Sequence, residues 1–449
     1  MTAKWVNKFR SYFTRRQNRF MDWMLSRNWV LSRFEDSQGK SSIKEFMNDL
    51  GMVFLYKVIG SVFTAVISIL AAHLLGPSGY GEINLVNNIS NILLLPMMAG
   101  INFSMYKYLP DSLSRQNDRL KTAALIGNFS LMGFFSLFYF QIGIFVKNTL
   151  KIGIPIWQMG IAATIVLDLY ILSESFMRGQ KKYLPLAHLK VAGSFIFFLM
   201  FLFWYYFQTM DFDHYFYSFF AAQVLFVMAA LYKSDFHSFS LSGSAFKQIY
   251  HYGAFNMFNS LLIMLISSSD FFMVNYFYPG RDLGIYSIYQ GFVRGLFSIM
   301  FYEVFAVVFL PAISGANKNR LFHTIQRFVP VLWLTIVLLT AGFTTVVVLL
   351  SGKEYPLNPG YILLTSSAIG FYSIFQIYNS IFTMEGNQGA KFCLIPLSFT
   401  IPVALLIQYY FTRYLGITGT MYAVMMTNLL LVAAFVVMHH WLQRVLKLS

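Results

Sequence analysis

Charged residues are scarce in this sequence. They make up 11% of its 449 residues, against roughly 25% in soluble domains, while 57% of the residues are hydrophobic. A water-soluble globular protein could not keep so much apolar surface from water, so this class is excluded. Lipid is the natural solvent of such a chain, and a helix needs ~20 apolar residues to cross it.

Cysteine, metal-binding motifs and long loops are also missing. The single cysteine, Cys393, excludes an intrachain disulfide, and no spacing typical of zinc or haem ligands is present. We therefore expect neither a metal site nor a cofactor. The outward connections between the apolar runs are too short to hold an inserted soluble domain. For that reason we predict no catalytic residues and expect that the chain is not an enzyme.

The apolar residues gather in long runs, each of which predicts a transmembrane helix. Barrel strands are not expected, because they would be ~10 residues long and would alternate polar with apolar residues. The predicted fold class is all-α, a polytopic membrane protein of about twelve helices. The predicted spans are 51–75, 83–107, 122–144, 153–176, 185–207, 213–232, 250–275, 283–311, 329–350, 359–384, 392–411 and 416–438.

Basic residues are distributed unevenly between the two sides of this arrangement. The net charge of +15 would suit a nucleic-acid ligand, but 26 of the 33 Lys and Arg residues fall in the termini and the even-numbered connections. Only five fall in the odd-numbered connections. Because cytoplasmic loops accumulate Lys and Arg, this split predicts that both termini are cytoplasmic and that the number of spans is even. It also argues against nucleic acid as a partner.

The two halves of the chain resemble each other. The turn after the first span, Leu75–Gly81, matches the turn between the seventh and eighth spans, Tyr278–Gly284, and an offset of 203 superposes Gly81 on Gly284. Two pseudo-symmetric lobes of six helices each, in the same orientation, would form a parallel repeat of the kind found in some secondary transporters. The predicted domains are a basic cytoplasmic or interfacial extension (1–48), an N-lobe (49–235), a C-lobe (236–440) and a cytoplasmic tail (441–449).

Polar side chains recur at helical spacing along the first, second, seventh and eighth spans. Such groups are costly in lipid and should face protein or a water-filled cavity. Two explanations stay open, namely hydrogen bonding between packed helices and a wet cavity between the lobes. We favour the cavity because the stripes are long and two of them carry a cation. The predicted substrate-binding residues are Lys57, Ser61, Thr64, Asn84, Asn88, Asn91, Asn256, Asn259, Ser260, Gln290 and Arg294.

The two cations of these stripes, Lys57 and Arg294, suit an anionic ligand. Arg offers a planar fork for phosphate oxygens, and Lys acts as a point charge. The amides and hydroxyls around them suit a sugar, so the stripes together predict a sugar carried on phosphate or pyrophosphate. For both cations, a structural ion pair is the alternative.

Acidic residues inside the spans form a second set of candidates. An acid in a medium of low dielectric can hold a proton, so Asp168, Asp270 and Glu303 are candidates for coupling transport to H+ or Na+. Structural ion pairs are again the alternative.

Three motifs resemble those of a known family. They are the turn Leu75–Gly81, the combination of Asp270 with Leu283–Ser287 (an Asp…Gly-x-Tyr-Ser pattern), and Leu415–Gly419 before the last span. With them, residues 45–440 resemble the polysaccharide and O-antigen flippases of the multidrug/oligosaccharidyl-lipid/polysaccharide (MOP) exporter superfamily. The 48-residue N-terminal extension is longer than is usual in that family.

The resemblance implies a transporter in the inner (cytoplasmic) membrane. It would flip a polyprenyl-pyrophosphate-linked oligosaccharide from the inner to the outer leaflet by alternating access, for O-antigen, lipopolysaccharide or other polysaccharide export. Its partners would be this lipid-linked oligosaccharide, membrane lipids and polysaccharide assembly proteins. The alternatives are a multidrug or other lipid exporter of the same superfamily, and a polytopic polymerase or glycosyltransferase.

Overall fold

A computed structural model describes the backbone of residues 37–110, 114–207, 210–235, 239–240, 242–297, 318–383 and 387–448. The chain divides into two compact units, Met1–Lys57 and Val58–Ser449. Of the first unit, residues 37–57 are helical and form the start of helix α2. The rest of the predicted N-terminal extension lies outside the described residues. The following paragraphs concern the second unit unless the first is named.

The secondary structure of the described residues is entirely helical, as the sequence predicts. No strand is present among them. The helices are α2 (Ser37–Met98), α3 (Ile101–Tyr108), α4 (Ser114–Gln141), α5 (Gly143–Leu150), α6 (Ile154–Gly179), α7 (Tyr183–Tyr206), α8 (Phe212–Tyr232), α9 (Gly243–Phe277), α10 (Arg281–Tyr286), the π-helix η2 (Ser287–Phe292), α11 (Val293–Phe297), α13 (Lys318–Ser351), α14 (Pro359–Thr383) and α15 (Asn387–Leu448).

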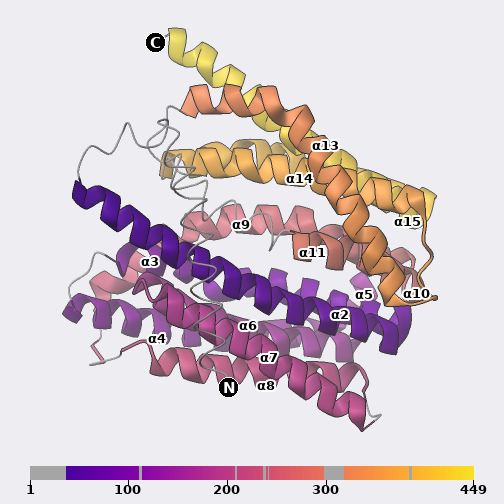
Figure 1. Ribbon diagram of the computed structural model, residues 1–449, viewed down its shortest axis with the longest axis horizontal. Helices are drawn as coiled ribbons and strands as arrows, with labels where there is room; N and C mark the ends of the chain where they lie inside the picture. Colours follow the sequence, from indigo (N-terminus) through magenta and orange to yellow (C-terminus); the bar gives the residue numbers. More distant parts are fainter. Residues whose placement is uncertain are drawn as a thin grey trace. The chain divides into compact units, whose positions relative to one another are not determined.

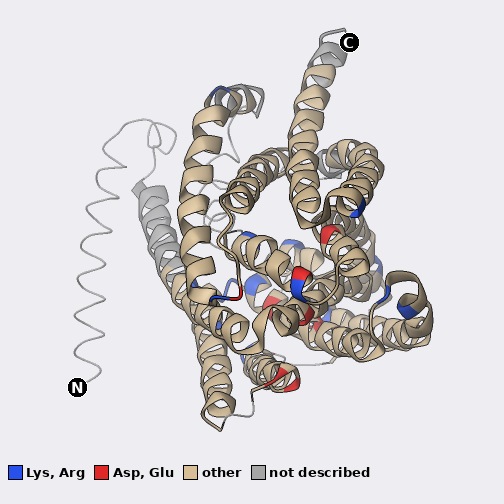
Figure 2. Cartoon of the chain, turned by 90° about the vertical axis from the view of Figure 1, so that its right-hand side faces the viewer, with Lys and Arg blue, Asp and Glu red and all other residues tan. Residues whose placement is uncertain are grey.

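Nine of the helices among these residues are long and apolar enough to cross a membrane. Charged residues, coloured blue and red in Figure 2, occupy only a few positions along the described helices. A backbone that satisfies its own hydrogen bonds is what the hydrocarbon region demands. The chain is therefore a multi-pass membrane protein.

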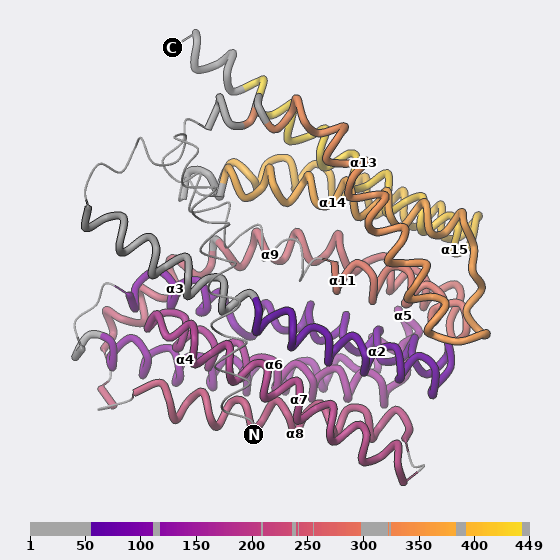
Figure 3. Tube along the Cα trace, viewed as in Figure 1, coloured from indigo at the N-terminus to yellow at the C-terminus, as the bar shows by residue number. Residues whose placement is uncertain are grey.

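Two of the nine helices reverse direction at a glycine. In α2, Gly76 has a left-handed φ of 65° and an extended ψ of −179°, so the helix is broken at this residue. In α15, Gly416 has a φ of 64°, and the hydroxyl of Thr420 reaches that of Thr412 at 2.9 Å. The reversal of α2 can be followed in Figure 3.

The reversals divide α2 and α15 into two segments of crossing length each. Counted this way, the described residues hold eleven such segments, and the predicted eighth span, 283–311, is described only as far as residue 297. The full number of twelve and the cytoplasmic placement of both termini stay predictions.

The helices of the second unit pack in two groups (Figure 1). In one, α6 packs against α4, α7 and α8, and in the other α14 packs between α13 and α15. We call Val58–Tyr232 the N-terminal bundle and Gly243–Leu448 the C-terminal bundle. Helix α9 belongs to both, because Ala245 and Ile249 lie in a buried cluster with Met98 and Ile101, whereas its later turns pack against α15.

The two bundles touch at both ends. At the end that holds Gly76, which the sequence predicts to be outer, the Tyr355 hydroxyl donates to the carbonyl of Ala72 at 3.2 Å. At the opposite end, which holds Gly100, the Ser104 hydroxyl donates to the carbonyl of Ile249 at 2.6 Å. We refer to these as the Gly76 end and the Gly100 end.

Candidate functional site

An acid, a phenol and a guanidinium meet in the C-terminal bundle. The Tyr286 hydroxyl donates to Asp270 Oδ2 at 2.6 Å, and the Arg294 guanidinium donates to the same oxygen at 3.1 Å. A second nitrogen of Arg294 donates to the backbone carbonyl of Ser267 at 2.6 Å. Of the five N–H groups of an arginine, Arg294 thus directs one at Asp270 and one at the Ser267 carbonyl.

The local fold explains why these three residues meet. Asp270 lies near the end of α9, and the turn at Gly280 returns the chain so that Tyr286 and Arg294 pass beside it. Between them lies the π-helical turn η2, a rare conformation that is frequent at functional sites. Asp270 is fully buried, while 13% of the Arg294 side chain is exposed. A buried carboxylate therefore orients a cation that solvent or a ligand can still reach.

This geometry explains why Asp and Tyr occur together in the Asp…Gly-x-Tyr-Ser pattern. Its acid and its tyrosine are the two partners of one short hydrogen bond. The sequence named Asp270 as a coupling candidate and Arg294 as a phosphate contact, with an ion pair as the alternative for each, but did not pair them. An ion pair exists, and whether Arg294 also binds a ligand is taken up below as a proposal.

Several of the predicted amides and hydroxyls bond within their own helix. The Asn84 amide donates to the carbonyl of Tyr80, Asn88 to that of Asn84, and Asn256 to that of Tyr252. Such bonds to the carbonyl one turn earlier satisfy the amide N–H in lipid while leaving the amide oxygen available to a neighbour or a ligand. Thr64 does the same with the carbonyl of Gly60.

Asn84 also reaches the other bundle. Its side-chain oxygen lies 2.8 Å from the point where a Cβ on Gly291 would be, so the second and eighth predicted spans touch at one of the predicted stripes. Gln290, one residue away, is fully buried and turns into the C-terminal bundle, where its amide donates to Thr365 at 3.3 Å.

The remaining predicted residues lie at various depths. Asn259 is buried, while Ser61, Asn91 and Ser260 are half-buried and Thr64 is exposed. Lys57 belongs to the first unit, where its side chain is half-buried in α2. Asp168 is fully buried in the N-terminal bundle and accepts a hydrogen bond from the Asn128 amide. Glu303 lies outside the described residues.

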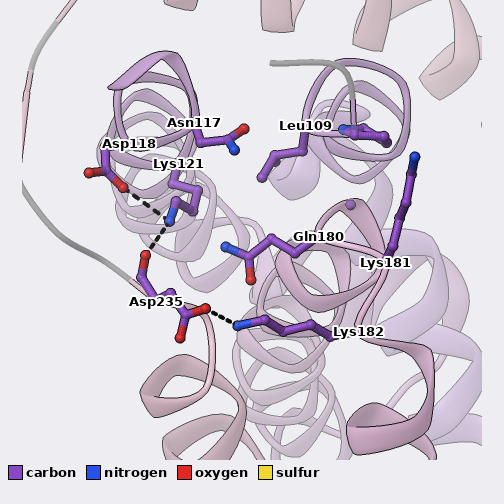
Figure 4. Close-up of a pocket in the computed structure, with 10 residues that line it drawn as sticks. Leu109, Asn117, Asp118, Lys121, Gln180, Lys181, Lys182 and Asp235 are labelled. Atoms are coloured by element: carbon purple, nitrogen blue, oxygen red, sulfur yellow. Dashed lines mark hydrogen bonds and ion pairs between the residues drawn. The ribbon is translucent and has the colours of Figure 1, made fainter. Parts of the chain in front are cut away.

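A polar pocket of about 280 Å³ at the Gly100 end was not expected from the sequence (Figure 4). Among the residues that line it, Lys121 pairs with Asp118 at 3.1 Å and donates to the carbonyls of Ser234 at 3.1 Å and Asp235 at 2.7 Å. Gln180 donates to the same Ser234 carbonyl. These contacts tie the start of the segment that joins the two bundles to the N-terminal bundle.

We expect Lys121→Met to lower the stability of the protein by roughly 3 kcal/mol, because it removes an ion pair and two charge-assisted bonds from a buried site. The Lys121 side chain is 1% exposed. Thermal unfolding of the purified protein would measure the loss. Lys181→Met is the matched control, since Lys181 lines the same pocket and is exposed. Equal melting temperatures for the two variants would contradict the role assigned to Lys121.

A larger cleft of about 680 Å³ opens in the N-terminal bundle between the starts of α6 and α8. Its lining combines two acids, Glu82 and Asp213, with Gln158 and with the rings of Phe212 and Tyr217. Acids beside aromatic faces are suited to an organic cation or to sugar hydroxyls. The sequence singled out neither acid as a site residue, because both lie near the ends of predicted spans.

Comparison with known proteins links this architecture to one group of transporters. No family model and no curated protein matches the sequence. Several solved structures match across most of their length, among them two MATE transporters and the lipid II flippase MurJ. An inward-facing multidrug resistance MATE family transporter of the MOP superfamily has a TM-score of 0.67 at 15% identity, over 85% of this chain and 93% of that one. A MATE transporter from Vibrio cholerae has a TM-score of 0.63 at 12% identity, over 91% and 99%. The lipid II flippase MurJ, in an inward closed conformation, has a TM-score of 0.60 at 14% identity, over 85% and 86%.

These similar structures are transporters and a flippase by name. At such low identity the likeness shows the fold alone. The chain is thus a multi-pass membrane protein whose described residues are helical and share the fold of MATE transporters of the MOP superfamily and of the lipid II flippase MurJ.

Proposed function

We propose that the chain is a flippase that moves a polyprenyl-pyrophosphate-linked oligosaccharide from the inner to the outer leaflet of the cytoplasmic membrane by alternating access. The sugar unit would enter a polysaccharide such as O-antigen, and polysaccharide assembly proteins would be its partners. Coupling to H+ or Na+ through Asp168, Asp270 or Glu303 belongs to the same proposal.

One observation carries the proposal, namely that Arg294 is paired with a buried carboxylate and is still partly exposed. A cation in a membrane-spanning segment is costly and marks a functional site by default. Asp270 fixes this guanidinium from the buried side, while its partial exposure leaves N–H groups for an anion. A planar guanidinium binds phosphate oxygens in a bidentate manner. Where the bundles meet, the buried amide oxygen of Asn84 packs against Gly291, so an opening of this contact would expose an oxygen of the kind that sugar hydroxyls bind.

We expect Arg294→Ala and Lys57→Ala each to reduce export by at least about tenfold per molecule of protein in the membrane. A charge-assisted hydrogen bond contributes ~1.5–3 kcal/mol, which corresponds to at least tenfold in rate. Lys57 is included only because the sequence places it in the polar stripe of the first predicted span. The measurement compares surface polysaccharide with lipid-linked oligosaccharide retained in the inner leaflet, in cells that lack the gene and carry each variant. Arg281→Ala, an exposed cation at the Gly76 end, is the control. Normal export by the double variant would refute the phosphate contacts.

A second candidate function is export of organic cations. The cleft lined by Glu82, Asp213 and aromatic rings favours it, because carboxylates and ring faces both attract cations. Efflux of tetraphenylphosphonium from proteoliposomes, lost in Glu82→Gln, would favour this function over glycolipid flipping.

A further inference from the structure

Three charged side chains form a cluster at the Gly100 end of the N-terminal bundle, outside the site described above. Glu174 and Arg178 lie one turn apart near the end of α6, and Lys190 faces them from α7. An Arg178 nitrogen lies 2.5 Å from Glu174 Oε1, and the Lys190 ammonium lies 2.6 Å from the same oxygen. Two cations thus converge on a single oxygen atom, and these three side chains together carry a net charge of one positive unit.

Among the described residues, most hydrogen-bond donors of these two cations have no partner. Arg has five N–H donors and Lys has three, and within the part of the chain that the structure describes one from each is directed at Glu174. Lys121 in the neighbouring polar pocket is the opposite case, because its three donors meet a carboxylate and two carbonyls. Lys121 is a structural lysine, whereas the Glu174 cluster retains donors for a ligand.

The cations of the Glu174 cluster are also more exposed than Lys121, which is 1% exposed. The side chains of Arg178 and Lys190 are 38% and 26% exposed, while Glu174 beneath them is 7% exposed. Each cation also lies over a ring, with Arg178 5.7 Å from the centroid of Tyr106 and Lys190 5.8 Å from that of Tyr170. Ring faces at this distance stabilise a cation and hold it in place without consuming its N–H donors.

From this arrangement we infer that Glu174, Arg178 and Lys190 form a binding site for a phosphate group, in which the ligand oxygens bind to Arg178 and Lys190 and Glu174 holds the two cations beside each other. A phosphate diester carries one negative charge and would neutralise the cluster. Arg supplies a planar fork and Lys a point charge, the pair of donors that suits a tetrahedral oxyanion. The inference rests on the proposed function in one respect, because the sequence predicts that this end is cytoplasmic, where a lipid-linked pyrophosphate would bind first.

Two sources could supply the phosphate, namely a lipid headgroup or free phosphate and pyrophosphate. Binding of inorganic pyrophosphate to the full-length protein in nanodiscs of neutral phosphatidylcholine tests the soluble source. Nanodiscs with phosphatidylglycerol, analysed by native mass spectrometry for retained lipid, test the headgroup. Either form of binding, if it depends on Arg178 and Lys190, supports the site. Binding in neither arm overturns it.

The variant Glu174→Gln gives the sharpest result, because the two possible roles of the cluster predict opposite signs. Removing the carboxylate from a phosphate site increases its positive charge, so we expect affinity to rise on the order of tenfold. If the cluster is only a structural ion pair, Glu174→Gln lowers the melting temperature and leaves affinity unchanged. That outcome would overturn the inference.

Lys190→Gln provides a second test that keeps the Glu174–Arg178 pair intact, so it is the better variant if Glu174→Gln does not fold. We expect it to weaken binding about tenfold, and Arg178→Gln with Lys190→Gln to abolish it. Lys147→Gln makes the same change of net charge at an exposed position on α5 and should leave binding unchanged. An equal effect of Lys147→Gln and Lys190→Gln would show a non-specific attraction and refute the site. Because this readout is binding rather than export, it can succeed or fail independently of the proposed function.

Discussion

Gly284→Val is expected to reduce transport at least about a hundredfold while the helices stay folded. A Cβ at this position would lie 1.6 Å from the carbonyl oxygen of Pro77 and 2.2 Å from its carbon. The opposing atoms belong to the backbone, so no change of rotamer relieves the clash, and the bundles must separate at the Gly76 end. A transporter that alternates between two closures loses its cycle when one closure is forbidden.

Two measurements would check this expectation. Transport in proteoliposomes gives the size of the effect, and labelling of Ile83→Cys by a membrane-impermeant maleimide reports the opening, because Ile83 is 1% exposed at this end. The only native cysteine, Cys393, is buried. Gly295→Val is the matched control, since a Cβ there meets no atom within 4 Å among the described residues. Wild-type transport by Gly284→Val would show that the contact is dispensable.

The internal repeat predicted a correspondence at this position but not a contact. An offset of 203 superposes Gly81 on Gly284, and a Cβ on Gly81 would lie 2.8 Å from the Gly284 nitrogen. Equivalent residues of two similar halves can touch only near the axis that relates the halves, as in a two-fold interface. The correspondence of Gly81 and Gly284 could be read from the sequence, whereas their contact depends on how the two bundles pack.

The helices themselves could be predicted because lipid leaves few alternatives. Long apolar runs must satisfy their own backbone hydrogen bonds, so these runs alone predicted the long apolar helices that the structure describes. The packing of α9 against both bundles could not be predicted from apolar runs. Ala245 and Ile249 are apolar residues that would suit either bundle, and only packing assigns them to the core that holds Met98.

The hydrogen-bond partners of the polar side chains in the four predicted stripes could not be predicted from the sequence. Helical spacing shows which side chains share a face. It does not show that Asn88 bonds to its own helix while Gln290 turns to Thr365. Likewise, Asp270 and Arg294 lie 24 residues apart, and their pairing depends on the turn at Gly280 and the π-helical turn, neither of which apolar periodicity reports.

A double-mutant cycle on Asp270 and Arg294 separates the structural from the transport role of this pair. Asp270→Asn or Arg294→Gln alone should cost about 3–5 kcal/mol, because each leaves the opposite charge buried without its counter-charge. The double variant removes both charges and should recover stability to within about 1 kcal/mol of the wild type. Thermal unfolding of the four proteins in one detergent measures the coupling.

Transport should not recover with stability in the double variant. If Arg294 only held Asp270 in place, the neutral pair would serve equally well, since Asn and Gln can keep a hydrogen bond where the ion pair was. If the guanidinium binds phosphate with its remaining N–H groups, the double variant stays at least about tenfold below the wild type even though it is stable. A stable and fully active double variant would therefore show that Asp270 and Arg294 have only a structural role. It would remove the observation on which the proposed function depends.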